Sequence, residues 1–205
     1  MRVLVVFNHP YERSYCNAIL KAVEVGLQKG NHYMDLIHLD NEGFDPVMRA
    51  KDLKAFVVAA KEPESSYNLL DEQVKKYKAK LLQADHVIFI FPIWWELMPA
   101  LTKGFIDKLI FPGTAYDYSE SGNRMIGRLK KLKGVTMIST MNTPAIAYRI
   151  LFGNAIKKAL LLGTFWKIGV GNRKWINLSF VKFVSATKRA KWLNRIEKYA
   201  KNLKT

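Results

Sequence analysis

The amino-acid sequence predicts a doubly wound α/β domain, and three observations support that fold class. Five short apolar runs recur along the 205 residues, and stretches with helical periodicity separate them. Two runs, Val3–Phe7 and Val87–Phe91, are apolar at successive positions, which is typical of strands buried on both faces of a parallel sheet. The alternation of strand and helix favours parallel strands joined by crossover helices. Because no repeat or linker interrupts the pattern, we expect one domain over residues 1–205.

The first predicted helix follows the first strand and spans residues 14–30, with Ser14 as its N-cap and Gly30 just past its end. Its residues Ile19, Val23 and Leu27 form one apolar stripe. The five strands are expected at Val3–Phe7, Met34–Leu39, Val87–Phe91, Val135–Thr140 and Phe165–Val170. Further helices are expected at residues 68–85, Pro99–Ile110, Ala145–Leu162 and Ser185–Leu203.

Positive charge is concentrated in the second half of the chain. Residues 1–122 carry 14 Lys or Arg and 16 Asp or Glu, whereas residues 123–205 carry 19 Lys or Arg and one acid, Glu197. The net charge is therefore −2 in the first part and +18 in the second, which together give +16. This asymmetry predicts a basic face for an anionic partner such as nucleic acid, an anionic membrane or a polyphosphate. The alternative is a set of ordinary solvated helix faces.

Several classes of protein are excluded by composition. A single cysteine, Cys16, excludes a disulfide framework and a multi-cysteine zinc site, and the four histidines lack the spacing of metal ligands. No apolar run approaches the ~20 residues of a membrane span, and the first residues lack the architecture of a signal peptide. We expect no metal and a reducing, cytoplasmic location.

In doubly wound folds, ligands bind beyond the carboxyl ends of the strands, which directs attention to three loops. The first loop, residues 8–17, leads into a helix N-terminus, where free N–H groups favour an anion. His9, the Ser14 hydroxyl and the amides of Tyr15 and Cys16 are candidates to hold a phosphate. The loop has neither the P-loop pattern nor the dinucleotide fingerprint, and an ordinary capped loop is the alternative.

The second loop, residues 92–99, contains the adjacent residues Trp94 and Trp95. Two indoles at a strand end are difficult to bury together, so at least one is expected to line a cleft as a wall for a planar heteroaromatic ring. The alternative is packing in the core or in a dimer. The third loop, residues 140–148, combines small and hydroxyl residues with Asn142, and Tyr148 can face the same cleft.

Three segments together resemble the NAD(P)H dehydrogenase (quinone) family. They are VLVVFNHP…RSYCNAI, IFIFPIWWELMPALTKGFIDKLIFPGTAYDY and the S-T-M-N-T-P loop. The middle segment is the most specific match, with F-P-x-x-W, a proline-led helix ending K-G-F-x-D-K, and a G-x-A-Y loop. The family includes quinone reductases, azoreductases and the ancillary oxidoreductases of potassium efflux systems. The similarity covers roughly residues 1–170.

The resemblance implies a flavodoxin-like fold with a five-stranded parallel sheet of order 2-1-3-4-5 and helices on both faces. It also implies non-covalently bound FMN, with FAD as the alternative, NAD(P)H as co-substrate, a small-molecule acceptor, and a homodimer with the site at the interface. By motif position, the flavin phosphate is expected to be bound by His9, Ser14, Tyr15 and Cys16. The ribityl chain and the ring are expected to be flanked by Pro92, Ile93, Trp94 and Trp95. The opposite side of the ring is expected to be closed by Thr140, Met141, Asn142 and Thr143. Tyr148 is the catalytic candidate near a ring carbonyl.

The expected function is hydride transfer from NAD(P)H to the flavin and then to a quinone, azo or nitro compound in a ping-pong cycle. The sequence departs from the family at Met141 and Asn142, where glycines are common, and at Phe152, where some quinone reductases carry a histidine. Two alternatives come from other classes: a regulatory subunit that contacts a membrane transporter, and a basic nucleic-acid-binding protein without a known motif. We expect no nucleic-acid partner, whereas the basic half leaves a peripheral contact with an anionic membrane or transporter open.

Overall fold

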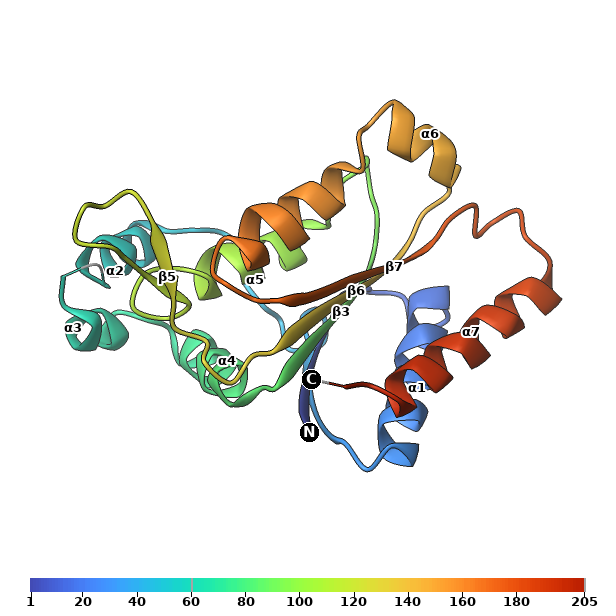
Figure 1. Cartoon of the computed structure of the whole chain (residues 1–205), viewed down its shortest axis with the longest axis horizontal. Coiled ribbons are helices and arrows are strands. Elements are labelled where there is room, and N and C mark those ends of the chain that lie inside the picture. The colour runs from blue at the N-terminus through green and yellow to red at the C-terminus, as the bar shows by residue number, and fades with distance from the viewer. Residues whose placement is uncertain (60, 205) are drawn as a thin grey trace.

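The structure is a computed structural model that describes residues 1–59 and 61–204 (Figure 1). Its central feature is an all-parallel sheet of five strands in the order β2-β1-β3-β6-β7. The strands are β1 Arg2–Phe7, β2 Tyr33–His38, β3 His86–Pro92, β6 Gly134–Thr140 and β7 Asn172–Leu178. Numbered within this sheet alone, the order is 2-1-3-4-5, so the predicted topology is confirmed.

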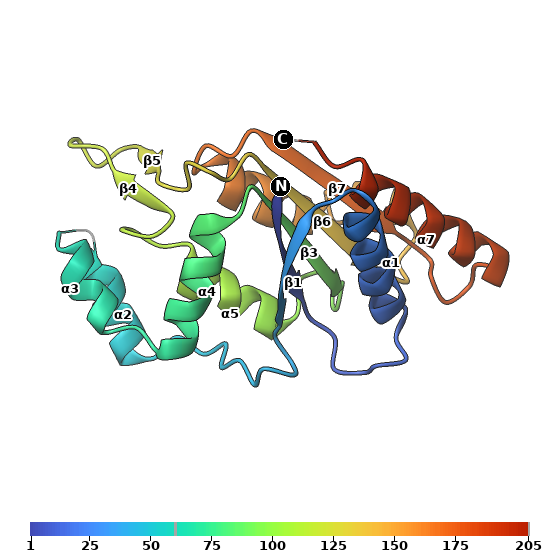
Figure 2. The same cartoon turned by 90° about the horizontal axis from the view of Figure 1, so that it is seen from below.

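Helices cover both faces of the sheet (Figure 2). One face packs against α1 Tyr15–Lys29 and α7 Ala186–Lys201. The other packs against α4 Glu72–Gln83, α5 Ala100–Leu109 and the π-helical segment η1 Lys157–Trp166. Alternate residues of β1 enter different cores: Val3 and Val5 face α1, whereas Leu4 and Val6 face the opposite layer. This two-sided burial explains why the strand is apolar at every position.

The predicted ends of α1 are confirmed. The Ser14 side chain accepts a hydrogen bond of 3.2 Å from the Asn17 amide, and Gly30 caps the other end. Gly26 lets α7 approach closely, since a Cβ atom there would lie 2.4 Å from the carbonyl oxygen of Glu197. An ion pair of 2.6 Å between Lys29 and Glu197 joins the same two helices.

The fifth predicted strand is wrong. Phe165 belongs to η1, and the run 165–170 ends that segment and turns into β7, which begins at Asn172. Because β7 is an edge strand with a strand neighbour on one side only, its residues alternate between exposed and covered positions rather than forming a continuous apolar run. The apolar residues Phe165, Ile168 and Val170 instead pack into the core beside η1.

Other boundaries also differ from the prediction. The helix expected at Ala145–Leu162 is divided into α6 Ala145–Ile150 and η1, and the helix expected at 68–85 begins only at Glu72. Four elements were not predicted: α2 Ala50–Ala59, α3 Pro63–Asn68 and the two strands of an antiparallel hairpin, β4 Tyr116–Tyr118 and β5 Met125–Gly127. The short hairpin strands lack the long apolar pattern that identifies the strands of the main sheet.

Candidate functional site

The three loops predicted from the sequence meet at the carboxyl ends of β1, β3 and β6. The amide of Ile93 donates a hydrogen bond of 2.7 Å to the carbonyl oxygen of Thr140, which joins the second loop to the third. The Thr140 hydroxyl lies 3.4 Å from the Cys16 thiol, which joins the third loop to the first. His9 meets Trp94 edge to face, with 6.2 Å between ring centroids. The strand ends therefore hold the three loops as one site.

The first loop presents hydrogen-bond donors at the N-terminus of α1. Within residues 1–59 and 61–204, the amides of Tyr15 and Cys16 have no acceptor, as expected for the first turn of a helix. His9 Nδ1 accepts a hydrogen bond of 3.1 Å from the Tyr11 amide, so the neutral ring carries its proton on Nε2. Burial lowers the pKa of His9, which favours this neutral form. The loop can thus donate several hydrogen bonds to an anion.

Asn8 supports this loop from below and was not singled out in the sequence. Its side-chain amide donates to Asp40 at 2.9 Å, and its carbonyl oxygen accepts from the Thr102 hydroxyl at 2.9 Å. The buried Asn8 therefore connects the end of β1 to the loop after β2 and to α5. An asparagine at a strand end gave no signal that distinguished it from an ordinary turn residue.

The second loop contains a tight turn with an unusual backbone. Trp95 and Glu96 have φ values of +48° and +64°, and two hydrogen bonds of 3.0 Å between Trp94 and Leu97 close the turn. In the part of the chain that the structure describes, the amides of Trp95 and Glu96 have no acceptor. Successive free amides in a turn form a concavity for negative charge. The Trp95 side chain is 98% exposed, so it is available to cover a ligand.

Glu96 joins the second loop to the third, a role that the sequence did not suggest. Its carboxylate accepts a hydrogen bond of 2.7 Å from the Thr143 hydroxyl. Its backbone carbonyl accepts one of 2.7 Å from the Tyr148 hydroxyl, which in turn accepts a bond of 3.0 Å from the Ile156 amide. Tyr148 is completely buried, and its hydroxyl is therefore already bonded within the protein. Burial also raises the pKa of Tyr148.

The third loop is anchored by the segment that follows β7. The amide of Met141 donates to Leu178, its carbonyl accepts from Val181, and its side chain is buried. Asn142 is exposed, and its side-chain oxygen accepts a hydrogen bond of 3.2 Å from the Lys182 amide. Met141 therefore supports the loop from beneath, whereas Asn142 and Thr143 lie nearer its surface. Pro92 is buried at the end of β3.

Cys16 and Tyr15 are held in their protonated forms. Burial raises the pKa of the Cys16 thiol to about 11, so it is a poor nucleophile despite its place at a helix N-terminus. Burial likewise raises the pKa of Tyr15 to about 12, and its hydroxyl donates a hydrogen bond of 2.7 Å to the carbonyl oxygen of Arg189. Both side chains therefore support the loop rather than react.

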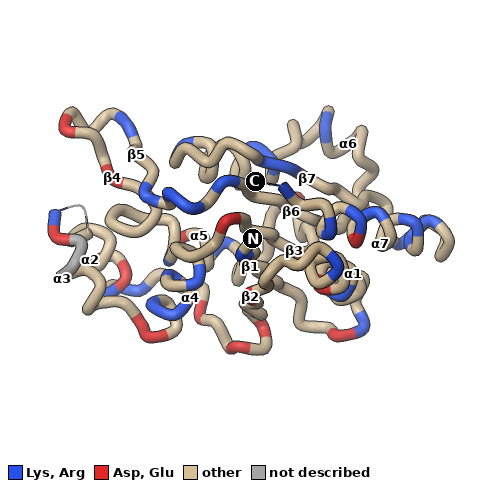
Figure 3. Tube along the Cα trace, turned by 60° about the horizontal axis from the view of Figure 1, so that its bottom comes forward, with Lys and Arg blue, Asp and Glu red and all other residues tan. Residues whose placement is uncertain are grey.

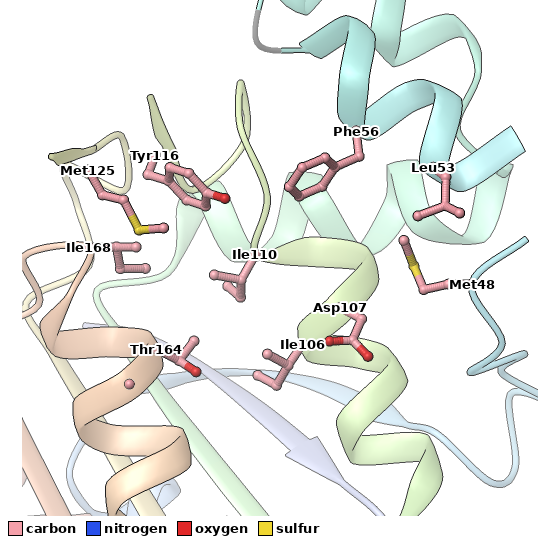
Figure 4. A pocket seen from close by; sticks show the side chains of 11 residues that line it. Met48, Leu53, Phe56, Ile106, Asp107, Ile110, Tyr116, Met125, Thr164 and Ile168 are labelled. Carbon is pink, nitrogen blue, oxygen red and sulfur yellow. The ribbon is translucent and has the colours of Figure 1, made fainter. Parts of the chain in front are cut away.

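A separate apolar pocket of about 310 Å³ lies between α2, α5, η1 and the β4–β5 hairpin (Figure 4). Asp107 is the only acid among its lining residues, which include Leu53, Phe56 and Ile110.

Over residues 1–59 and 61–204, no cluster of three His, Cys, Asp or Glu residues is arranged to hold a metal ion. Across the same residues, no helix has both the length and the apolar character needed to cross a membrane.

Known proteins share this fold and, in part, this sequence. An uncharacterized NAD(P)H oxidoreductase of Haemophilus influenzae is 26% identical over 175 residues, which cover 84% of this chain and 80% of that protein. The crystal structure of Smu.1420 from Streptococcus mutans is 31% identical, covers 99% of this chain and 100% of that one, and gives a TM-score of 0.84. An FMN-dependent NADH-azoreductase of Bacillus anthracis, solved with FMN, shares the fold at 15% identity with a TM-score of 0.78, covering 97% of each chain.

The chain spans about half the length of two further curated relatives, 50% of one and 53% of the other. The family model described as flavodoxin-like fold matches residues 1–203, which is nearly the whole sequence. That match agrees with the observed strand order and with the three loops at the carboxyl edge of the sheet. The chain therefore belongs to the flavodoxin-like fold family.

Proposed function

We propose that this protein is an FMN-dependent NAD(P)H oxidoreductase that reduces quinone, azo or nitro compounds. The proposal is carried by two pairs of backbone amides that have no acceptor and lie at the same end of the sheet. One pair is Tyr15 and Cys16, and the other is Trp95 and Glu96. The first set suits a phosphate, and the second suits the oxygen-bearing edge of a planar ring. The names of the relatives, an NAD(P)H oxidoreductase and an FMN-dependent azoreductase, support the same chemistry.

The residues of the first loop fit a flavin phosphate. Free amides at Tyr15 and Cys16 combine with the positive end of the α1 dipole. The neutral ring of His9 adds one donor at Nε2, since its Nδ1 already accepts from Tyr11. The Ser14 hydroxyl already accepts from Asn17 as the N-cap and retains its own proton for donation.

The second and third loops fit the isoalloxazine ring. Trp94 and the fully accessible Trp95 supply aromatic surface, and Pro92 and Ile93 lead into that surface from β3. Thr140, Asn142 and Thr143 would form the opposite side, above the buried Met141. We prefer FMN to FAD because the azoreductase of Bacillus anthracis that shares this fold was solved with FMN.

Bound FMN would supply the redox chemistry, because a flavin accepts a hydride from a nicotinamide and then passes electrons to an acceptor. The chain would bind and orient the reactants. The free amides of Trp95 and Glu96 would stabilise negative charge at the polar edge of the ring, in the manner of an oxyanion hole. Since both reactants must reach the same ring, donor and acceptor occupy one place in turn, which gives a ping-pong cycle.

The sequence predicted a catalytic role for Tyr148, and the geometry supports a positioning role instead. Its hydroxyl has one proton, which it donates to the carbonyl of Glu96. That bond orients the peptide that follows Glu96 and so stabilises the tight turn. We propose that Tyr148 acts on the reaction through this turn and transfers no proton itself. The cytoplasm, where NAD(P)H is available and thiols stay reduced, suits this activity and the free Cys16.

We further propose that two copies associate through the face that contains the apolar pocket. Leu53 and Val57 of α2 are 54% and 69% exposed beside it. The residues that line the pocket include one acid, Asp107, and no Lys or Arg, so a two-fold contact on this face involves little repulsion. Leu53→Asp should shift the sedimentation mass toward the monomer, whereas Leu82→Asp on α4 should not. Equal sedimentation masses for both variants would refute the proposal that two copies associate through this face.

Absorption spectroscopy tests the function directly. The purified protein, stripped of ligand and titrated with FMN, should bind at micromolar concentration. NADH or NADPH should bleach the flavin bands without oxygen, and a soluble quinone should restore them. Initial rates at several concentrations of both substrates should give parallel double-reciprocal lines. Absence of FMN binding would refute the proposal, and intersecting lines would refute the ping-pong cycle alone.

A further inference from the structure

The carboxyl end of the sheet carries a second exposed surface next to the three loops. It consists of residues 145–152, which include α6, and residues 179–185, which follow β7; we call it the α6 tip (Figure 1). Six of its apolar side chains are 42–74% exposed: Ile146, Ile150, Leu151, Phe152, Phe180 and Phe183. Large apolar residues gathered at one end of a molecule mark a contact with another surface.

The structure holds these side chains outward. Phe180 and Phe183 pack against each other with ring centroids 4.4 Å apart, and Phe180 has a φ value of +60°. The loop that carries them is bonded to the third loop through Lys182 and Asn142. Arg189 of α7 also donates a hydrogen bond of 2.8 Å to the carbonyl oxygen of Val184. The aromatic pair is thus preformed on an anchored loop.

Cations surround the apolar side chains. Arg149 and Lys182 are exposed within the α6 tip, and Lys157, Lys158 and Lys188 are exposed on the adjoining elements. Residues 121–196 contain no Asp or Glu, so these cations have no acid nearby in sequence. Among the side chains that the structure describes, no carboxylate forms an ion pair with any of them. Figure 3 shows the Lys and Arg positions on α6 and α7.

We propose that the α6 tip docks the protein on an anionic phospholipid bilayer. Ile150, Leu151 and Phe183 would enter the boundary between headgroups and acyl chains, while Arg149 and Lys182 would meet lipid phosphates. The positive charge of the α6 tip argues against a second copy of this chain as the partner, because a two-fold contact would place the same cations opposite each other. Nucleic acid fits this surface less well, because half of the exposed apolar side chains, Ile146, Ile150 and Leu151, are aliphatic and offer no stacking surface for bases. This inference is independent of what the flavin site does.

Co-sedimentation with phosphatidylcholine vesicles, with and without phosphatidylglycerol, tests the proposal on the full chain. We expect binding to the anionic vesicles, at least about tenfold weaker binding to neutral ones, and loss of binding as salt is raised. The double substitution Arg149→Glu with Lys182→Glu should weaken binding at least about tenfold. The matched control, Lys130→Glu with Lys201→Glu, changes the same charge in the basic half near the amino ends of the strands and should weaken it far less.

A second pair of variants tests the apolar contribution. Ile150→Ser with Phe183→Ser should reduce binding to anionic vesicles, whereas Tyr33→Ser with Leu82→Ser, also exposed, should not. Thermal unfolding checks that each variant folds. If the serine variants do not fold, the charge variants alone test the proposal. Equal binding to neutral and anionic vesicles, or no binding to either, would overturn the proposal. A change in sedimentation mass for the tip variants would assign this surface to a second copy instead.

Vesicle binding is measured with and without FMN. The two forms should bind alike, because the side chains proposed to contact the bilayer, Ile150, Leu151, Phe183, Arg149 and Lys182, are not among those proposed to bind FMN. Failure to bind FMN therefore leaves this test intact, and failure to bind vesicles leaves the proposed redox activity intact.

Discussion

The Tyr148 hydroxyl donates a hydrogen bond of 2.7 Å to the carbonyl oxygen of Glu96, which lies 52 residues earlier in the chain. The same hydroxyl accepts a bond from the buried amide of Ile156. One side chain therefore joins α6, the start of η1 and the turn at Trp95.

Tyr148→Phe should lower stability by about 1–3 kcal/mol, because it leaves the Ile156 amide buried without an acceptor. FMN affinity should fall as well, since the turn at Glu96 loses its partner. Urea unfolding and fluorescence titration measure the two effects, and Tyr118→Phe, at a half-exposed position in the hairpin, is the control. If Tyr148 transfers a proton instead, the variant will change the pH profile of turnover and leave FMN affinity unchanged.

Trp95→Ala should weaken FMN binding about tenfold, because one aromatic stacking contact contributes about 1–3 kcal/mol. Its melting temperature should stay close to that of the parent protein, since a side chain that is 98% exposed buries nothing in the ligand-free fold. Trp166→Ala removes another exposed indole, far from the three loops, and should change neither quantity. Equal FMN affinity for both variants would show that Trp95 is no wall of the site.

His9→Ala should weaken the binding of FMN about tenfold and that of riboflavin much less, because its Nε2 proton would be donated to the phosphate. Isothermal titration with both ligands provides the comparison. His32→Ala, at the amino end of the sheet, is the matched control. A similar loss for riboflavin would place His9 against the ring rather than the phosphate.

His86 should make the protein less stable in mild acid. The side chain is buried at the start of β3, its Nε2 lies 2.8 Å from the Thr136 hydroxyl, and burial lowers its pKa to about 4. The unfolded chain takes up this proton near pH 6.5, whereas the folded state resists it. The stability from this group is therefore complete above about pH 6.5 and is lost toward pH 4, by up to about 3 kcal/mol.

Urea unfolding across this pH range measures the effect. His86→Gln should flatten the dependence of unfolding free energy on pH, while His38→Gln, in β2, should leave the slope of the parent protein. Identical slopes for the parent and His86→Gln would show that other groups control the acid response.

Cys16 should be nearly unreactive in the folded protein. With its pKa raised to about 11 and its side chain 2% exposed, little thiolate is present at neutral pH and reagents have poor access. Mass spectrometry after iodoacetamide treatment should show slow alkylation in buffer and fast alkylation in urea. Fast alkylation of the native protein would indicate that the first loop opens.

The sequence located the three loops because each follows an apolar strand, and buried strands are the strongest signal in a parallel sheet. Trp94 and Trp95 were identified because paired indoles at a strand end are conspicuous. Glu96 was missed because its role depends on two consecutive positive φ angles and on contacts with Thr143 and Tyr148, which are distant in sequence. The fifth strand was misplaced because β7 has the mixed composition of an edge, while the apolar run before it belongs to η1.

The composition of that edge strand has a consequence for the behaviour of the protein at high concentration. In the part of the chain that the structure describes, β7 has a strand partner on one side only, and such an edge is a template for sheet extension between molecules. Arg173 and Lys174 lie on it, with Lys174 over the ring of Tyr199 at 4.0 Å. Two molecules that meet edge to edge through β7 would therefore bring like charges together, which discourages the growth of fibrils along this side of the sheet.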